Sequence, residues 1–211
     1  MGIKAWLQAH WRGGGKAAKS KAELSIHIHE DDWGMRSLVP LAAFAEIQQD
    51  IAKAQEASAK NAAPNGGGWT DMYIARPPSI DYSAIPLRLN DAVEVLAKHF
   101  PRIPKFTATA SAGFSSDVRD PYGSYETEAQ CYGTGSSCFI KLEHRDAVVN
   151  SIWFEGRTNK HEDISRLREA VIALNAIVPS VIADYWLSAS GVISDRDFMD
   201  RYFDALLLPG A

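Results

Sequence analysis

Residues 139–156 read FIKLEHRDAVVNSIWFEG and carry the clearest hairpin signal in the chain. Apolar and polar residues alternate on both sides of the short polar stretch HRDA at 144–147. This period of two is typical of half-buried antiparallel strands joined by a tight turn. The pattern predicts strands over 138–143 and 147–155, and the stretch GTGSS at 133–137 separates them from a third strand over 126–132.

The first half of the chain mixes strand and helix patterns. Residues 23–29 alternate strictly, while the short runs at 70–78 and 105–114 also read as strands. Residues 41–60 are rich in Ala, Glu, Gln and Lys, with Leu41, Phe44, Ile47 and Ile51 at helical spacing. A second helix is expected over 90–100, with Asn90 as its N-cap.

The C-terminal third reads as helical. Helices are predicted over 161–178, over 179–190 with Pro179 at the first helical position, and over 194–208 with Ser194 as the cap. The strands therefore cluster in the middle of the chain, which disfavours a doubly wound dinucleotide-binding fold. We expect an α+β fold with a central antiparallel or mixed sheet of about five strands, helices on one face and a helical C-terminal third.

Length and charge set the broad class of the protein. The 211 residues fit one α+β domain over 23–211, preceded by a flexible basic arm at 1–22. A formal net charge of −4 gives no global attraction to nucleic acid or to anionic membranes. No apolar run approaches the roughly 18–20 residues that span a bilayer, and no secretory signal is visible. The expected location is cytoplasmic.

Cys131 and Cys138 are the two cysteines of the chain, and they flank the predicted turn at 133–137. In a reducing cytosol we expect free thiols packed as small hydrophobic residues. In an oxidising compartment a disulfide across the hairpin is the alternative.

The strongest candidate site is the stretch SIHIHEDDWGM at 25–35. On a strand, His27 and His29 point to the same face with their Cα atoms about 6–7 Å apart, so both imidazoles could reach one metal ion. Glu30, Asp31 or Asp32 could add an oxygen ligand or a general base for metal-assisted hydrolysis. A third protein ligand would come from elsewhere in the chain, and the candidates are His144 and His161.

The alternative interpretation of this stretch is a polar binding edge. The histidines would line the solvent face of an edge strand, and the acids would end that strand. Trp33 and Met35 would pack into the core, and Gly34 would make the turn. We favour this interpretation because H-x-H is a short motif. The candidate binding residues here are His27, His29, Asp31, Asp32 and Trp33.

Two further candidate sites lie towards the C-terminus. The run DYWLSASGVISDRDFMDRYFD at 184–204 combines aromatic and acidic residues, and such a surface suits a basic protein partner. Its candidate binding residues are Asp197, Asp200 and Asp204. A small-ligand pocket between the sheet and the C-terminal helices is a third possibility, lined by Trp153, Tyr185 and Trp186.

No complete catalytic motif is present in the sequence. The stretch TGSSC lacks the spacing of a nucleophile elbow, and GGGKAAKS at 13–20 lacks that of a phosphate loop. The sequence therefore favours a non-enzymatic protein that binds a protein partner, with no cofactor and no nucleic-acid or membrane partner. A metal-dependent hydrolase and a small-ligand binding domain remain the alternatives.

The stretch IHIHEDDWGMRSLVP, followed by an alanine-rich helix, resembles the opening of small uncharacterised bacterial proteins. In its general make-up the chain is similar to immunity-type proteins of bacterial polymorphic and contact-dependent toxin systems. Those are small acidic α+β proteins that bind and block a cognate toxin. The resemblance implies a protein partner and assigns a role to no individual residue.

Overall fold

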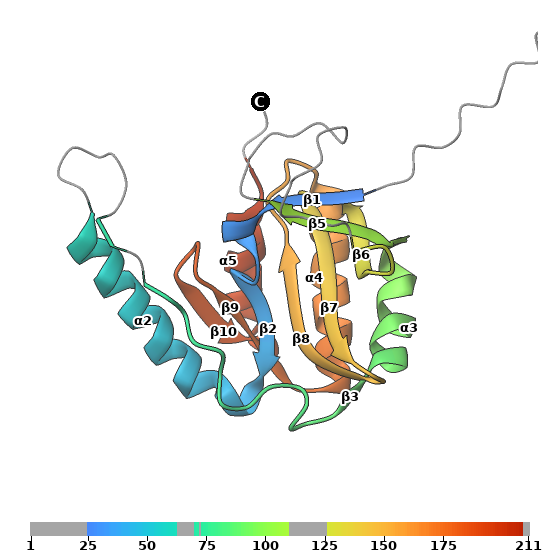
Figure 1. Ribbon diagram of the computed structural model, residues 1–211, viewed down its shortest axis with the longest axis horizontal. Coiled ribbons are helices and arrows are strands. Elements are labelled where there is room, and N and C mark those ends of the chain that lie inside the picture. Colours follow the sequence, from blue (N-terminus) through green and yellow to red (C-terminus); the bar gives the residue numbers. More distant parts are fainter. Residues whose placement is uncertain (1–24, 63–69, 72, 110–125, 209–211) are drawn as a thin grey trace, which may run out of the picture.

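The computed structural model describes residues 25–62, 70–71, 73–109 and 126–208 (Figure 1). The predicted basic arm at 1–22 lies outside these residues, as do positions 110–114 of the strand expected over 105–114. The described part is a mixed α+β structure with four α-helices and an antiparallel sheet of eight strands.

The large sheet has the strand order β10-β9-β2-β8-β7-β6-β4. β3 lies off this path and pairs with the first residues of β8. Its strands are β2 (Arg36–Pro40), β3 (Leu87–Arg88), β4 (Arg102–Ile103), β6 (Gln130–Gly135), β7 (Cys138–Arg145), β8 (Val148–Glu155), β9 (Ser180–Asp184) and β10 (Ala189–Val192).

The predicted hairpin at 139–156 is confirmed at the centre of this sheet. β7 and β8 pair from Phe139 opposite Glu155 to Arg145 opposite Val148, with a bulge between Glu143 and His144. The preceding strand, β6, begins four residues later than the start of the run expected over 126–132.

β1 (Ser25–His29) and β5 (Lys105–Thr109) form a separate two-stranded parallel sheet, which lies across one end of the large sheet in Figure 1. The alternation expected for this stretch holds in β1. Ile26 is fully buried with Phe106, Phe139 and Trp153 beneath the small sheet, whereas His27 and His29 on the other face are partly exposed.

Helices cover both faces of the large sheet, which corrects the expectation of one helical face. α3 (Leu89–His99), α4 (His161–Ile177) and α5 (Arg196–Leu206) pack on one side, and α4 and α5 lie behind the sheet in Figure 1. α2 (Phe44–Asn61) packs on the opposite side, against Val181 and Ala183 of β9. Because side chains alternate along β9, its two faces supply both cores.

The helix expected over 179–190 is wrong, because the chain forms the β9–β10 hairpin there. All five residues of β9 are buried, so the strand shows no alternation in the sequence. A short continuous apolar run cannot be distinguished from a buried helix by periodicity. Pro179 precedes a strand in the structure, and the C-terminal third is therefore a helix, a hairpin and a helix.

The strand count of about five is also too low. β3 and β4 contain two residues each, which is too short to give a sequence pattern. Conversely, residues 73–78 of the expected 70–78 strand are irregular in the structure. They lie along α2, where Tyr73 donates to Asp50 at 2.5 Å and Ser79 bonds to Glu46. The prolines at 77 and 78 explain why no ladder forms.

Both cysteines are buried free thiols, as expected for a reduced protein. Cys131 packs with the core beneath the small sheet, and Cys138 packs with the core under α3, α4 and α5. The two side chains lie on opposite faces of the sheet, so the disulfide alternative across the hairpin is excluded by geometry. No described helix is both long and apolar enough to cross a membrane.

Candidate functional site

The connection from β1 to β2 contains the acids of the IHIHEDDW stretch. Residues Glu30–Asp32 form a single 3₁₀ turn, and His29 caps it because its Nδ1 accepts the Asp31 backbone N–H at 3.2 Å. Gly34 then takes a left-handed φ of 70°, which an L-residue adopts at a cost. The acids and the glycine thus end one strand and turn the chain into the next, as the sequence indicated.

Trp33 projects from this turn and is 47% exposed. One side of its indole is held firmly: the ring packs at 5.3 Å from Trp153 and meets the Phe106 ring edge-on at 5.4 Å. The ammonium group of Lys141 lies 5.2 Å from the Trp33 ring centroid, within cation–π range. The inner side of Trp33 is therefore anchored and its outer side faces solvent.

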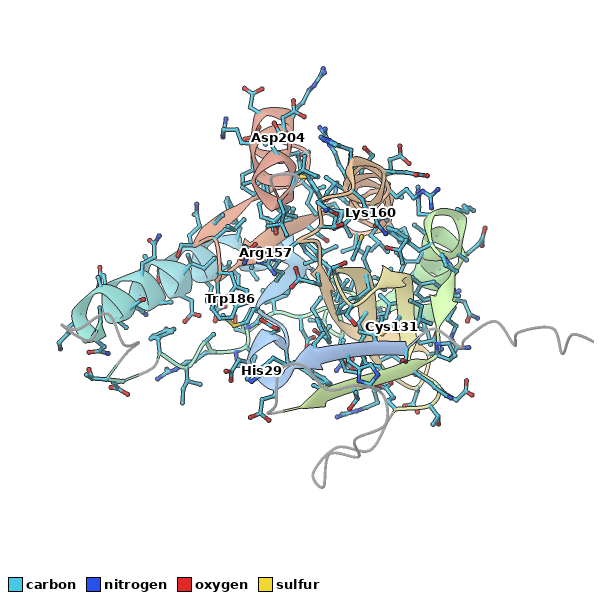
Figure 2. All side chains as sticks on the ribbon, turned by 90° about the horizontal axis from the view of Figure 1, so that it is seen from above. His29, Cys131, Arg157, Lys160, Trp186 and Asp204 are labelled. Atoms are coloured by element: carbon cyan, nitrogen blue, oxygen red, sulfur yellow. The ribbon has the colours of Figure 1, made fainter. Side chains whose placement is uncertain are left out.

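A second half-exposed tryptophan lies on the neighbouring loop. The Tyr185 backbone N–H donates to the Met35 carbonyl at 2.9 Å, so the β9–β10 turn at 185–188 lies beside the β1–β2 connection. Trp186 and Leu187 in this turn are 46% and 39% exposed. Figure 2 shows Trp186 on the same side of the molecule as His29.

We call this region the tryptophan surface. Its members share exposure on two adjacent loops at one end of the large sheet, and they are Trp33, Trp186, Leu187, Glu30, Asp31 and Asp32. Glu30 and Asp31 are exposed and Asp32 is half-buried. No lysine or arginine occurs in 25–35 or in 185–188. The surface therefore combines large apolar groups with negative charge.

A buried ionic network lies directly behind the tryptophan surface. Arg36 follows the β1–β2 connection and Asp184 precedes the β9–β10 turn, and their side chains are 2% and 0% exposed. The Arg36 Nε donates to Asp184 at 2.9 Å and its Nη1 donates to Glu155 at 2.6 Å. Tyr202 of α5 donates to the same Asp184 oxygen at 2.9 Å, and burial raises the pKa of that phenol well above its usual range.

This network fixes the two loops to the sheet. It joins β2, β8, β9 and α5 at the end where the loops leave the sheet. The other Asp184 oxygen accepts the Leu187 backbone N–H at 2.8 Å, and the Tyr185 hydroxyl donates to Asp50 of α2 at 2.7 Å. The β9–β10 turn is thus held from both ends, and burial raises the pKa of Tyr185.

Lys141 provides equivalent support beneath Trp33. Its ammonium group is fully buried and pairs with Glu143 at 2.6 Å and with Glu126 at 3.0 Å. Glu143 also accepts the Trp153 indole N–H at 3.2 Å. These contacts satisfy the buried cation and fix the rings that Trp33 packs against.

The metal hypothesis lacks a ligand set in the described residues. His27 and His29 share a face as predicted, but His27 Nε2 bonds to Ser25 Oγ at 3.2 Å and His29 bonds to the turn. Among residues 25–62, 70–71, 73–109 and 126–208, no group of three His, Cys, Asp or Glu side chains could hold a metal ion. His144 lies near the end of β7 and His161 starts α4, both in other parts of the fold.

The acids of α5 form a separate group from the tryptophan surface. Asp200 pairs with Arg168 of α4 and lies 3.8 Å from Arg196, whereas Asp197 and Asp204 are exposed. Figure 2 shows Asp204 and His29 at opposite sides of the molecule. The sequence thus named two acidic regions that the structure does not bring together.

The proposed small-ligand pocket is not formed by its predicted residues. Trp153 is buried on the sheet face opposite α4 and α5, beneath the small sheet. Tyr185 packs beside α2 and Trp186 is half-exposed. The three side chains therefore do not line a space between the sheet and the C-terminal helices.

Comparisons of the chain with protein-family models, with curated proteins and with solved structures found no match.

Proposed function

We propose that the protein is a non-enzymatic binding module whose tryptophan surface docks on a basic segment of another protein. The observation that carries the proposal is the pair of half-exposed indoles, Trp33 and Trp186, on adjacent loops fixed by buried ionic networks. Tryptophan is enriched among the residues that dominate interface energetics. An indole held on one side and open on the other loses little conformational entropy on binding.

The negative charge of the tryptophan surface supports a basic partner. Glu30 and Asp31 lie exposed beside Trp33, and the two loops carry no lysine or arginine of their own. Complementary charge steers association and selects among partners more than it adds affinity. A partner segment with lysine or arginine next to apolar side chains fits both features of the surface.

A narrower form of the proposal follows from the resemblance stated above. A small acidic protein that binds a basic partner has the properties of an immunity or accessory protein, acting in the cytoplasm on a cognate toxin. The half-exposed indoles of Trp33 and Trp186 support a contact surface of this kind, because each leaves a large apolar area open to solvent.

The proposal is tested by affinity capture from the source organism with three forms of the full chain. The wild type should retain a stoichiometric partner protein, and Trp33→Ala/Trp186→Ala should lose it. The matched control is Ile172→Ala/Ile177→Ala, which removes two exposed apolar residues of α4 on the opposite side of the sheet. Equal retention by the double tryptophan variant, or no retained protein with the wild type, contradicts the proposal.

A further inference from the structure

The large sheet ends in two different edges. At one edge, β4 has two residues between Pro101 and Pro104, and its Arg102 side chain binds the carbonyls of Glu128 and Ala129. Proline, charge and shortness are common means by which proteins prevent strand addition at an edge. At the other edge, β10 has the sequence ASGV, with no proline, charged residue or bulge.

The outer side of β10 presents unpaired backbone groups. Ser190 faces Ala183 and Val192 faces Val181 in the β9–β10 register, and Ile193 donates its N–H to the Ser180 carbonyl. Because bonded and non-bonded pairs alternate in antiparallel strands, Gly191 bonds inward to β9 while Ser190 and Val192 direct N–H and C=O outward. Within the part of the chain that is described, no strand or isolated bridge pairs with this outer edge.

β10 is held in place without an added strand. A Cβ atom built on Gly191 would lie 2.4 Å from the Phe198 ring, so the strand backbone rests directly on α5. On the other face, Val192 packs with the cluster formed by α2 and β9. The edge is therefore a rigid template rather than a loop that must order on binding.

The edge adjoins the tryptophan surface at one end of β10 and the acids that begin α5 at the other end. Trp186 and Leu187 immediately precede β10, and Asp195 and Asp197 follow it. The exposed charges of residues 180–206 are three aspartates and two arginines, since Asp184 is buried against Arg36 and the partly buried Asp200 pairs with Arg168. Among the described residues, Asp197 and Asp204 take part in no ion pair.

We propose that β10 accepts an extended, basic segment of the partner protein as an added strand of the large sheet. This inference rests on the proposed function and adds the manner of binding. Strand addition gives affinity through main-chain hydrogen bonds, while side-chain contacts give specificity. The acids flanking β10 favour a lysine- or arginine-bearing strand over a second copy of this chain, which itself carries a net charge of −4.

The test uses the full-length protein and a synthetic peptide in which lysine and valine alternate. Backbone amide exchange is followed by NMR with and without the peptide. The amide N–H groups of Ser190 and Val192 should exchange at least about tenfold more slowly when the peptide is bound. The same peptide N-methylated on every residue, which removes the N–H donors on both of its edges, should give no protection.

Two variants complete the test. Ser190→Pro removes an outward N–H at a position where an edge proline is tolerated, and it should weaken peptide binding at least about tenfold. Ser190→Thr keeps that N–H and should bind like the wild type. If Ser190→Pro does not fold, as judged by circular dichroism, the amide exchange of the wild type and the N-methylated peptide still decide the question.

Three results would overturn strand addition at β10: no binding of the peptide, binding without protection of Ser190 and Val192, or equal binding by folded Ser190→Pro. Failure of the proposed function has a different signature, because it is read from Trp33→Ala/Trp186→Ala in the capture experiment. If that variant loses the partner while Ser190→Pro retains it, the tryptophan surface stands and the added strand does not.

Discussion

Arg36 connects the interior of the protein to its exposed loops. It lies in a strand whose neighbours are apolar, and its charge is compensated by Asp184 and Glu155 rather than by water. The run SVIAD is apolar except at its last position, Asp184, which carries the charge that pairs with Arg36. Nothing in the sequence spacing pairs residues 36 and 184, which are brought together only by the antiparallel register of β2 and β9.

Replacing Arg36 with methionine should strongly destabilise the protein. The change leaves the fully buried Asp184 carboxylate without its cation, and such a loss costs about 3–5 kcal/mol. Urea unfolding measures the free energy, with the exposed Arg157→Met as the control, expected within about 0.5 kcal/mol of the wild type. A loss below about 1 kcal/mol for Arg36→Met would show that Asp184 does not depend on this partner.

The two cysteines should be unreactive in the folded protein. Burial raises the pKa of the Cys131 and Cys138 thiols to about 12, so little thiolate exists at neutral pH. A thiol reagent added at neutral pH should label neither residue until the protein is unfolded. Rapid labelling of the native state would place at least one thiol at the surface.

At the level of secondary-structure elements, the sequence predicted long, regular segments well. The β7–β8 hairpin and helices α2, α3 and α4 lie close to their expected ranges, because each carries a sustained period of two or 3.6. α5 also forms, although Asp195 caps it in place of the expected Ser194, by accepting the Phe198 N–H at 3.1 Å. The predictions are wrong where a strand is very short or is buried on both of its faces.

The candidate site was predicted in part for the same reason. Asp31 and Asp32 follow a clearly alternating strand, so their position at its end could be inferred, whereas Trp33 was expected in the core and is half-exposed. The sequence predicts a helix over 179–190, so it does not indicate the turn that carries Trp186 and Leu187. The second half of the tryptophan surface can be predicted only if DYWLSASG is interpreted as a turn between two short strands.

Gly133 controls the packing of the β6–β7 pair. A Cβ atom at this position would lie 2.3 Å from the Cys138 carbonyl and 2.6 Å from the Phe139 Cβ, next to a register shift. Gly133→Ala should therefore destabilise the protein by about 1–3 kcal/mol, because backbone atoms must move. In thermal unfolding, Ser137→Ala in the same hairpin should match the wild type. A Gly133→Ala protein as stable as the wild type would contradict the close approach.

At the level of the whole molecule, the buried charges and the exposed indoles occupy different places in the fold. Helices cover both faces of the large sheet, and the charges within it are paired. Among the described residues, the exposed indoles of Trp33 and Trp186 lie at one end of the sheet, on loops that the paired charges hold fixed. Trp186→Ala should therefore affect binding more than folding, whereas Trp33→Ala also removes the packing against Trp153 and Phe106.

Trp33 and Trp186 are proposed to bind a protein partner together. The most direct test is calorimetric titration of the captured partner into the wild type, into Trp33→Ala/Trp186→Ala and into Ile172→Ala/Ile177→Ala. With two residues contributing about 2 kcal/mol each, we expect a loss of affinity of about 1,000-fold for the tryptophan variant and wild-type affinity for the control. An unchanged dissociation constant for a folded tryptophan variant would contradict it.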